Sequence, residues 1–317
     1  MDRLRQDLAL ALRGIRRAPG FAATVVLTIA LGVGANGAMF SCFDRVFVRA
    51  PGGVQAPSEI RRLYVQAHDY HDPKKLLVYA SFQYPHFESI TAANSGTPIG
   101  AYDTDSVLIR VGGTAISGTA AWVSANYFAA LGVTAVRGRL FGADEARPDI
   151  PTPVAIITHA LWTTQFGADS AIVGRTIDID KRHFTIIGVA APGFTGIDVN
   201  AVDVFAPLNM EPAGGRLGAP WYRSYNAVMT LFARVGAGAR EGPMLARSSA
   251  AYDHTPAIPG FSFDTTAAVV SGPIVQALGP GIQARGVTIG LRVAGVALAL
   301  LLIACANVAT LLLVRAT

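Results

Sequence analysis

The sequence has little charge, few lysines and almost no cysteine. Charged residues make up 15% of the chain and hydrophobic residues 51%, whereas a soluble domain usually carries about 25% charge. This composition is therefore not typical of a simple aqueous globule. The cysteines, Cys42 and Cys305, lie at the end of one apolar run and inside another, so the middle of the chain has no disulfide framework.

The sequence also lacks the motifs of several enzyme classes. No Gly-Lys dipeptide occurs, and the lysines are Lys74, Lys75 and Lys181, so the chain has no Walker A loop to hold phosphates. Cys-x-x-Cys, His-Glu-x-x-His and Gly-x-Ser-x-Gly are absent as well. We expect a protein that is not an enzyme, with no catalytic residues, no cofactor and no ATP hydrolysis of its own.

Two long runs contain no Asp, Glu, Lys or Arg, at residues 21–43 and 293–314. As helices they are about 33 to 35 Å long, enough for a hydrocarbon core of about 30 Å. They predict two transmembrane helices, at residues 21–43 and 286–314, around a folded region at 44–285. A cleaved signal peptide ending near Ala35-Asn36-Gly37 is the alternative for the first run, but the apolar stretch continues past that point, which favours a retained anchor.

Charge at the amino terminus sets the expected topology. Residues 1–20 hold five arginines, which keeps this end cytoplasmic and sends the middle across a plasma (inner) membrane. The short end at 315–317 returns to the cytoplasm. Residues 1–20 read either as an amphipathic helix on the membrane surface or as a merely basic juxtamembrane segment. Because the basic excess lies beside the membrane, the sequence pI of about 9.4 indicates membrane lipids rather than nucleic acid as its partner.

The middle of the chain has the patterns of an α+β domain. Two β-α-β units are expected, separated by a mainly β insertion, which predicts one split domain rather than two in tandem. The first unit has strands at 60–66 and 97–102 around a helix at 84–93, and the second has strands at 228–235 and 265–271 around a helix at 243–252. The insertion has hairpins turning at Gly112-Gly113 and Lys181-Arg182, a strand at 154–157, a helix at 158–167, a strand near 203–207, and a short helix capped by Ser124 and ended by Gly132.

Candidate functional residues lie mainly in the apolar runs. Ala30, Gly34 and Ala38 recur every four residues, which would let another helix approach closely. Asn36 and Asn307 are amides in apolar surroundings and need hydrogen-bond partners, in helix packing or, alternatively, along a transport pathway. These five residues are the predicted helix-packing site.

A second cluster, His68-Asp69-Tyr70-His71-Asp72, has the side chains of a divalent cation site. A solvated polar loop between a strand and a helix is the favoured interpretation of it, and no metal is expected.

Several segments resemble a known family. They are ALRGIRRAPGFAATVVLTIALGVGANGAMFS, VSANYFAALGVTAVRGRLF, PVAIITHALWTTQFGADSAIVGRTIDIDKRHFTIIGVAAPGFTG and LLLIACANVATLLLVRA. Together they resemble an FtsX/MacB-type ABC transporter permease of the duplicated orphan permease group, with a MacB-like periplasmic core domain. The resemblance implies an ABC-type ATPase subunit in trans, and a second permease half or a homodimer partner. Such permeases have at least four spans, so the chain is expected to be a fragment or a truncated product.

Two functions follow from these observations. The first is a permease subunit of a MacB/FtsX-like ABC export or mechanotransmission complex, which transmits motion between a cytoplasmic ATPase and the periplasmic domain. The second is a membrane-anchored extracytoplasmic binding or scaffolding module without transport activity.

Overall fold

The computed structural model describes residues 19–43, residues 50–210 except 70, 71, 73 and 199, residues 228–236, 241–255, 264 and 266–274, and scattered positions from 292 to 310. The chain divides into two units, one of Met1–Phe47 with Ala284–Thr317 and one of Val48–Gln283. The expected amphipathic helix lies almost wholly outside the described residues. The predicted domain boundaries at 20/21, 43/44, 285/286 and 314/315 stay predictions.

The first unit contains helix α2 (Pro19–Phe43). Small and apolar residues without charge favour this helix, and the hydroxyl groups of Thr24, Thr28 and Ser41 donate to carbonyl oxygens four residues earlier in the chain. The large side chains of Leu27 and Leu31 are 68% and 78% exposed. Judged on the described residues, no helix combines the length and the apolar character needed to cross a membrane.

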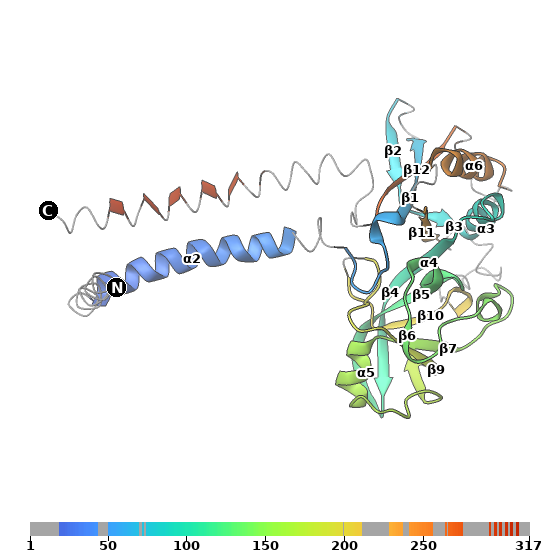
Figure 1. The fold of residues 1–317 in the computed structure, drawn as a ribbon, viewed down its shortest axis with the longest axis horizontal. Coiled ribbons are helices and arrows are strands. Elements are labelled where there is room, and N and C mark those ends of the chain that lie inside the picture. Colours follow the sequence, from blue (N-terminus) through green and yellow to red (C-terminus); the bar gives the residue numbers. More distant parts are fainter. Residues whose placement is uncertain are drawn as a thin grey trace. The chain divides into compact units, whose positions relative to one another are not determined.

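The second unit is built on two interleaved β-α-β units (Figure 1). The neighbouring strands run in the order β12-β1-β11-β4, and each adjacent pair is antiparallel. Hence β1 is parallel to β4 and β11 is parallel to β12, which is the split β-α-β arrangement of ferredoxin-like folds. The elements are β1 (Ile60–His68), α3 (Tyr84–Ala93), β4 (Ile99–Val111), β11 (Val228–Arg234), α6 (Glu241–Asp253) and β12 (Ala268–Pro273). The expected packing of the two units across the insertion is confirmed.

Helices α3 and α6 pack against each other beside this part of the sheet (Figure 1). The imidazole of His86 stacks on the ring of Tyr252, with 4.1 Å between the ring centres. Asn94 at the end of α3 donates to the hydroxyl of Ser248 on α6. Two short strands that the sequence patterns do not predict, β2 (Leu76–Tyr79) and β3 (Phe82–Gln83), pair with β1 and β11 respectively.

The insertion extends the same sheet through the order β4-β5-β10-β7-β9-β6. Strands β5 and β10 are parallel, as are β7 and β9, and the other pairs along this path are antiparallel. Strand β8 pairs with β4 and β9. The elements are β5 (Thr114–Val123), α4 (Tyr127–Leu131), β6 (Ala135–Gly138), β7 (Val154–Ile157), α5 (His159–Phe166), β8 (Thr176–Ile179), β9 (Arg182–Ala190) and β10 (Val204–Pro207), with short 3-10 turns η2 (Pro57–Glu59), η3 (Ala143–Ala146) and η4 (Leu208–Met210).

Local chemistry decides most of the turns. Gly112 and Gly113 have φ of 55° and 89°, as the predicted hairpin requires. Thr158 caps α5 by accepting from the amide of Leu161, and Gly132 ends α4 in the left-handed conformation. The predicted turn at Gly112-Gly113 and the predicted helix end at Gly132 are confirmed.

Three local predictions are wrong. Ser124 does not cap α4, because its hydroxyl is the acceptor for the amide of Ala101 on the neighbouring strand. The strand predicted at 97–102 does not end there, since it is the first part of β4 and pairing with β5 continues from Tyr102 to Val111. The turn between β8 and β9 is centred on Asp180-Lys181, where both residues have positive φ, and Arg182 already belongs to the strand.

The sheet has a hydrophobic core on each face. Successive residues of one strand contribute to different cores, as Ala101 and Tyr102 do on β4, because side chains alternate along a strand. The first core is covered in part by α3, α5 and α6. The second core contains α4, Phe194 and Ile197 from the 191–198 loop, and partly buried Val54. It is therefore the place where the start of the domain meets the sheet.

Candidate functional site

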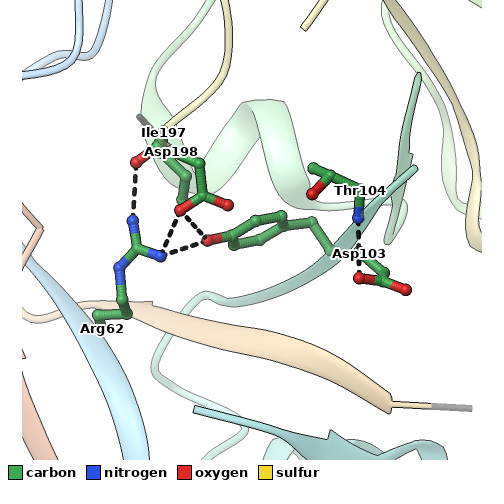
Figure 2. Close-up of polar contacts among 6 residues, drawn as sticks. Arg62, Asp103, Thr104, Ile197 and Asp198 are labelled. Carbon is green, nitrogen blue, oxygen red and sulfur yellow. Dashed lines mark hydrogen bonds and ion pairs between the residues drawn. The ribbon is translucent and has the colours of Figure 1, made fainter. Parts of the chain in front are cut away.

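A buried arginine marks the second core. Arg62 lies on β1, and its side chain is only 4% exposed. Its Nη1 donates to Asp198 Oδ1 at 2.7 Å and also to the hydroxyl of Tyr102, and its Nη2 donates to the carbonyl oxygen of Ile197 at 2.7 Å. The Tyr102 hydroxyl donates in turn to Asp198 Oδ1 at 3.0 Å. Figure 2 shows this Arg62–Tyr102–Asp198 network, which joins β1, β4 and the 191–198 loop.

Burial and neighbouring charge have opposite effects on the pKa of Arg62. Burial lowers the pKa of Arg62, but the nearby hydroxyl of Tyr102 and carboxylate of Asp198 together raise it, so the arginine stays charged. Burial also raises the pKa of Tyr102 well above its usual value, so the hydroxyl stays protonated and able to donate. A buried pair of this kind stabilises little on balance, but removal of one partner leaves an uncompensated charge.

Asp103 follows Tyr102 on β4 but lies at the far end of the tyrosine ring, away from Arg62 (Figure 2). Its Oδ1 accepts from the amide of Thr104 at 2.8 Å. Burial raises the pKa of Asp103 to about 6. The carboxyl group is therefore outside the network that holds the 191–198 loop.

A cluster of aromatic rings lies in the second core next to the network. The ring of Tyr127 has its centre 5.9 Å from that of Tyr102 and 5.5 Å from that of Phe232. Phe194 of the 191–198 loop stacks on Phe205 of β10, with 5.4 Å between centres. The loop is thus held by a buried ring as well as by the charged network.

The first residues of the domain lie directly against this loop. We call residues 50–59 the linker segment, because they precede β1 and follow the apolar helix in the sequence. A Cβ atom at Gly52 would lie 2.5 Å from the carbonyl oxygen of Gly193, and one at Gly53 would lie 2.9 Å from Cβ of Phe194. Gly53 also has φ of 76°. Only glycine fits at either position without displacement of the loop.

The other end of the linker segment is held by Arg234, the last residue of β11. Its guanidinium donates to the carbonyl oxygens of Ala130 at 2.6 Å and Gln55 at 2.8 Å, and pairs with the carboxylate of Glu59 at 3.0 Å. The amide of Gln55 donates to the carbonyl of Leu131 at the end of α4. The linker segment is therefore attached to the insertion, through the 191–198 loop and α4, and to the β-α-β part, through β11.

The described residues of the predicted helix-packing site belong to α2 and not to the Arg62–Tyr102–Asp198 network. Ala30, Gly34 and Ala38 are exposed on α2, and a Cβ atom at Gly34 would have no neighbour within 4 Å among the described residues. The side-chain amide of Asn36 donates to the carbonyl of Gly32 in its own helix at 2.8 Å. Asn307 is outside the described residues. Their role in helix packing stays a prediction.

Two residues of the predicted polar loop at 68–72 take part in separate contacts. His68 Nδ1 lies 3.1 Å from Asp264 Oδ2, and Asp69 Oδ2 lies 3.3 Å from Lys75 Nζ; Tyr70 and His71 are outside the described residues. Within the described part of the chain, no three His, Cys, Asp or Glu side chains gather as metal ligands would.

Sequence reasoning missed Arg62, Asp198 and Arg234. One signal was available for Arg62, which lies in the apolar strand IRRLYV, where one of two adjacent arginines must face a core. No signal pointed to Asp198, because its partners are distant in the sequence.

Comparison with known proteins agrees with this fold. Residues 22–247 match the family model of the MacB-like periplasmic core domain. No curated protein matches the chain significantly.

Among solved structures, a domain assigned to a permease protein from Porphyromonas gingivalis has a TM-score of 0.52 at 12% identity, covering 69% of this chain and 91% of that one. The periplasmic region of MacB from Actinobacillus actinomycetemcomitans has 0.47 at 12% identity, covering 70% and 91%. The extracellular domain of the noncanonic ABC-type transporter YknZ from Gram-positive bacteria has 0.44 at 15% identity, covering 61% and 92%.

Proposed function

This chain belongs to the family of the MacB-like periplasmic core domain, and we propose that it acts as a permease subunit of a MacB/FtsX-like ABC export or mechanotransmission complex. In this proposal the chain hydrolyses nothing itself. An ABC-type ATPase subunit on the cytoplasmic side supplies the energy, and a second permease half or a second copy completes the membrane part. The absence of any Gly-Lys pair in the sequence supports a separate ATPase.

The proposal places residues 21–43 and 286–314 across the plasma membrane and the domain outside. The complete sequence of 21–43 has no charged residue, and α2 extends over Pro19–Phe43. Its large side chains Val26, Leu27 and Leu31 are exposed, as contact with lipid requires. Five arginines before residue 21 support a cytoplasmic amino terminus.

One observation carries the mechanical part of the proposal, namely the double attachment of the linker segment. Residues 50–59 are the part of the domain nearest in sequence to the first apolar helix. They contact the insertion at Gly193 and Phe194 and the β-α-β part at Arg234. A displacement that enters the domain through this segment therefore reaches both parts at once.

The test reconstitutes the full chain in nanodiscs with an ABC-type ATPase from the same organism. A fluorophore on Asp144→Cys, in a chain whose native cysteines are replaced by serine, reports motion of the domain when ATP is added. We expect an ATP-dependent signal that Gly53→Ala reduces strongly. Gly113→Ala is the matched control, because Gly113 also has positive φ but a Cβ atom there has no neighbour within 4 Å.

If no ATPase assembles with the chain and ATP produces no signal, transmission of motion is refuted. The chain would then be a membrane-anchored extracytoplasmic binding or scaffolding module. An ATP-dependent signal that is equal in Gly53→Ala and Gly113→Ala would refute the role of the linker segment alone.

A further inference from the structure

Two sets of contacts meet in the 191–198 loop. Gly193 and Phe194 lie against Gly52 and Gly53 of the linker segment. Three and four residues after Phe194, the carbonyl of Ile197 and the carboxylate of Asp198 bind the guanidinium of Arg62. The loop lies between β9 and β10, and among the residues that the structure describes no strand pairing includes it. Side-chain contacts and a few backbone hydrogen bonds, such as that from Ala191 to the carbonyl of Thr134, therefore set its position.

From this arrangement we infer that the Arg62–Tyr102–Asp198 network locks the linker segment in place, acting at a distance through the 191–198 loop. With the network intact, the 191–198 loop is held in the position that residues 50–54 contact. When the network is weakened, the loop moves and residues 50–54 separate from the second core. The biological purpose of such a lock rests on the proposed function, whereas the lock itself is a property of the domain.

The close fit at the glycines explains how the lock is transmitted. Backbone atoms of the two segments are already at contact distance, since even a Cβ atom at Gly52 would overlap the carbonyl of Gly193. Phe194 is only 1% exposed and its ring is fixed against Phe205. Because the contact is already tight, a shift of the loop must displace Gly52 and Gly53 as well.

The lock controls only the first part of the linker segment. Arg234 holds Gln55 and Glu59, and the amide of Gln55 also donates to the carbonyl of Leu131. These contacts do not involve the 191–198 loop. Release of the lock therefore frees residues 50–54, while Arg234 keeps residues 55–59 attached.

The inference is tested by thiol labelling of the full chain in nanodiscs, with Cys42 and Cys305 replaced by serine. Val54→Cys reports on the linker segment, and Leu140→Cys reports on a residue of the second core that is not part of this segment; both native side chains are partly buried against that core. Asp198→Asn weakens the network. We expect labelling at Val54→Cys to rise about tenfold or more, since a hydrogen bond to a charged group contributes about 1.5 to 3 kcal/mol. Labelling at Leu140→Cys should change less than about twofold.

Asp149→Asn is the matched control, because Asp149 forms an exposed ion pair with Arg147, and it should leave both rates unchanged. Equal increases at Val54→Cys and Leu140→Cys would mean general loosening and would overturn the inference, as would no increase at Val54→Cys. If Asp198→Asn does not fold, Tyr102→Phe removes one hydroxyl of the network and is judged by the same two rates. No ATPase takes part, so the lock and the proposed function can fail independently.

Discussion

Asp198→Ala should be among the most damaging single changes to the domain, although Asp198 is not fully buried. The substitution removes the carboxylate that lies 2.7 Å from Nη1 of Arg62, and the arginine side chain is only 4% exposed. Loss of one partner from a buried ion pair costs about 3–5 kcal/mol, because the remaining charge is left uncompensated. For a domain of this size that corresponds to a fall in Tm of roughly 6–20 °C.

The assay is thermal and urea unfolding of residues 48–283, which we expect to form a soluble, cooperatively folded domain, followed by circular dichroism. Asp149→Ala is the control, since the Arg147–Asp149 pair is exposed and spans 3.8 Å; such pairs contribute about 0–1 kcal/mol. The double variant Arg62→Met/Asp198→Ala removes the stranded charge and should be more stable than Asp198→Ala alone. The reasoning is refuted if Asp198→Ala costs no more than Asp149→Ala, or if the second substitution destabilises the domain further.

Other predictions test the acid sensitivity, packing and topology of the chain. Burial lowers the pKa of His86 from 6.5 to about 4, so the unfolded state binds a proton at a higher pH than the folded state. The domain should therefore lose up to about 3 kcal/mol of stability as pH falls from about 6.5 to 4. A stability profile for His86→Phe as steep as that of the wild type would contradict this. In a membrane association assay, Gly34→Leu should weaken assembly more than Asn36→Leu, because close approach matters at least as much as an amide contact of about 0.6–2 kcal/mol; the opposite order would show that the amide dominates. In intact cells, an external thiol reagent should label a cysteine near Asp144 but not one at Arg5, and labelling of both would overturn the topology.

The domain elements were predictable because their signals are local. The expected helix at 84–93 coincides with α3, and the double glycine at 112–113 forms the hairpin turn that its conformational freedom allows. The errors came from competition with distant groups. The hydroxyl of Ser124, for instance, had a cap available nearby but bonds the amide of Ala101 on another strand.

The candidate site was much less predictable than the fold. Arg62 carries a hint, since an apolar strand cannot expose both Arg61 and Arg62 on one face. Asp198 carries none, and the glycines of the linker segment look like an ordinary flexible turn. Their restriction becomes visible only when Gly193 and Phe194 are placed against them.

By itself, the sequence determined the kind of elements, the pairing of two β-α-β units around an insertion, and the resemblance that the family match supports. These depend on periodicity and turn chemistry over a few neighbouring residues. Only the tertiary structure decided which charge is buried and what it holds, because Arg62 is 40 residues from Tyr102 and 136 from Asp198. Whether an arginine is solvated or locked depends on the groups that folding brings within hydrogen-bond distance, and no local pattern records them.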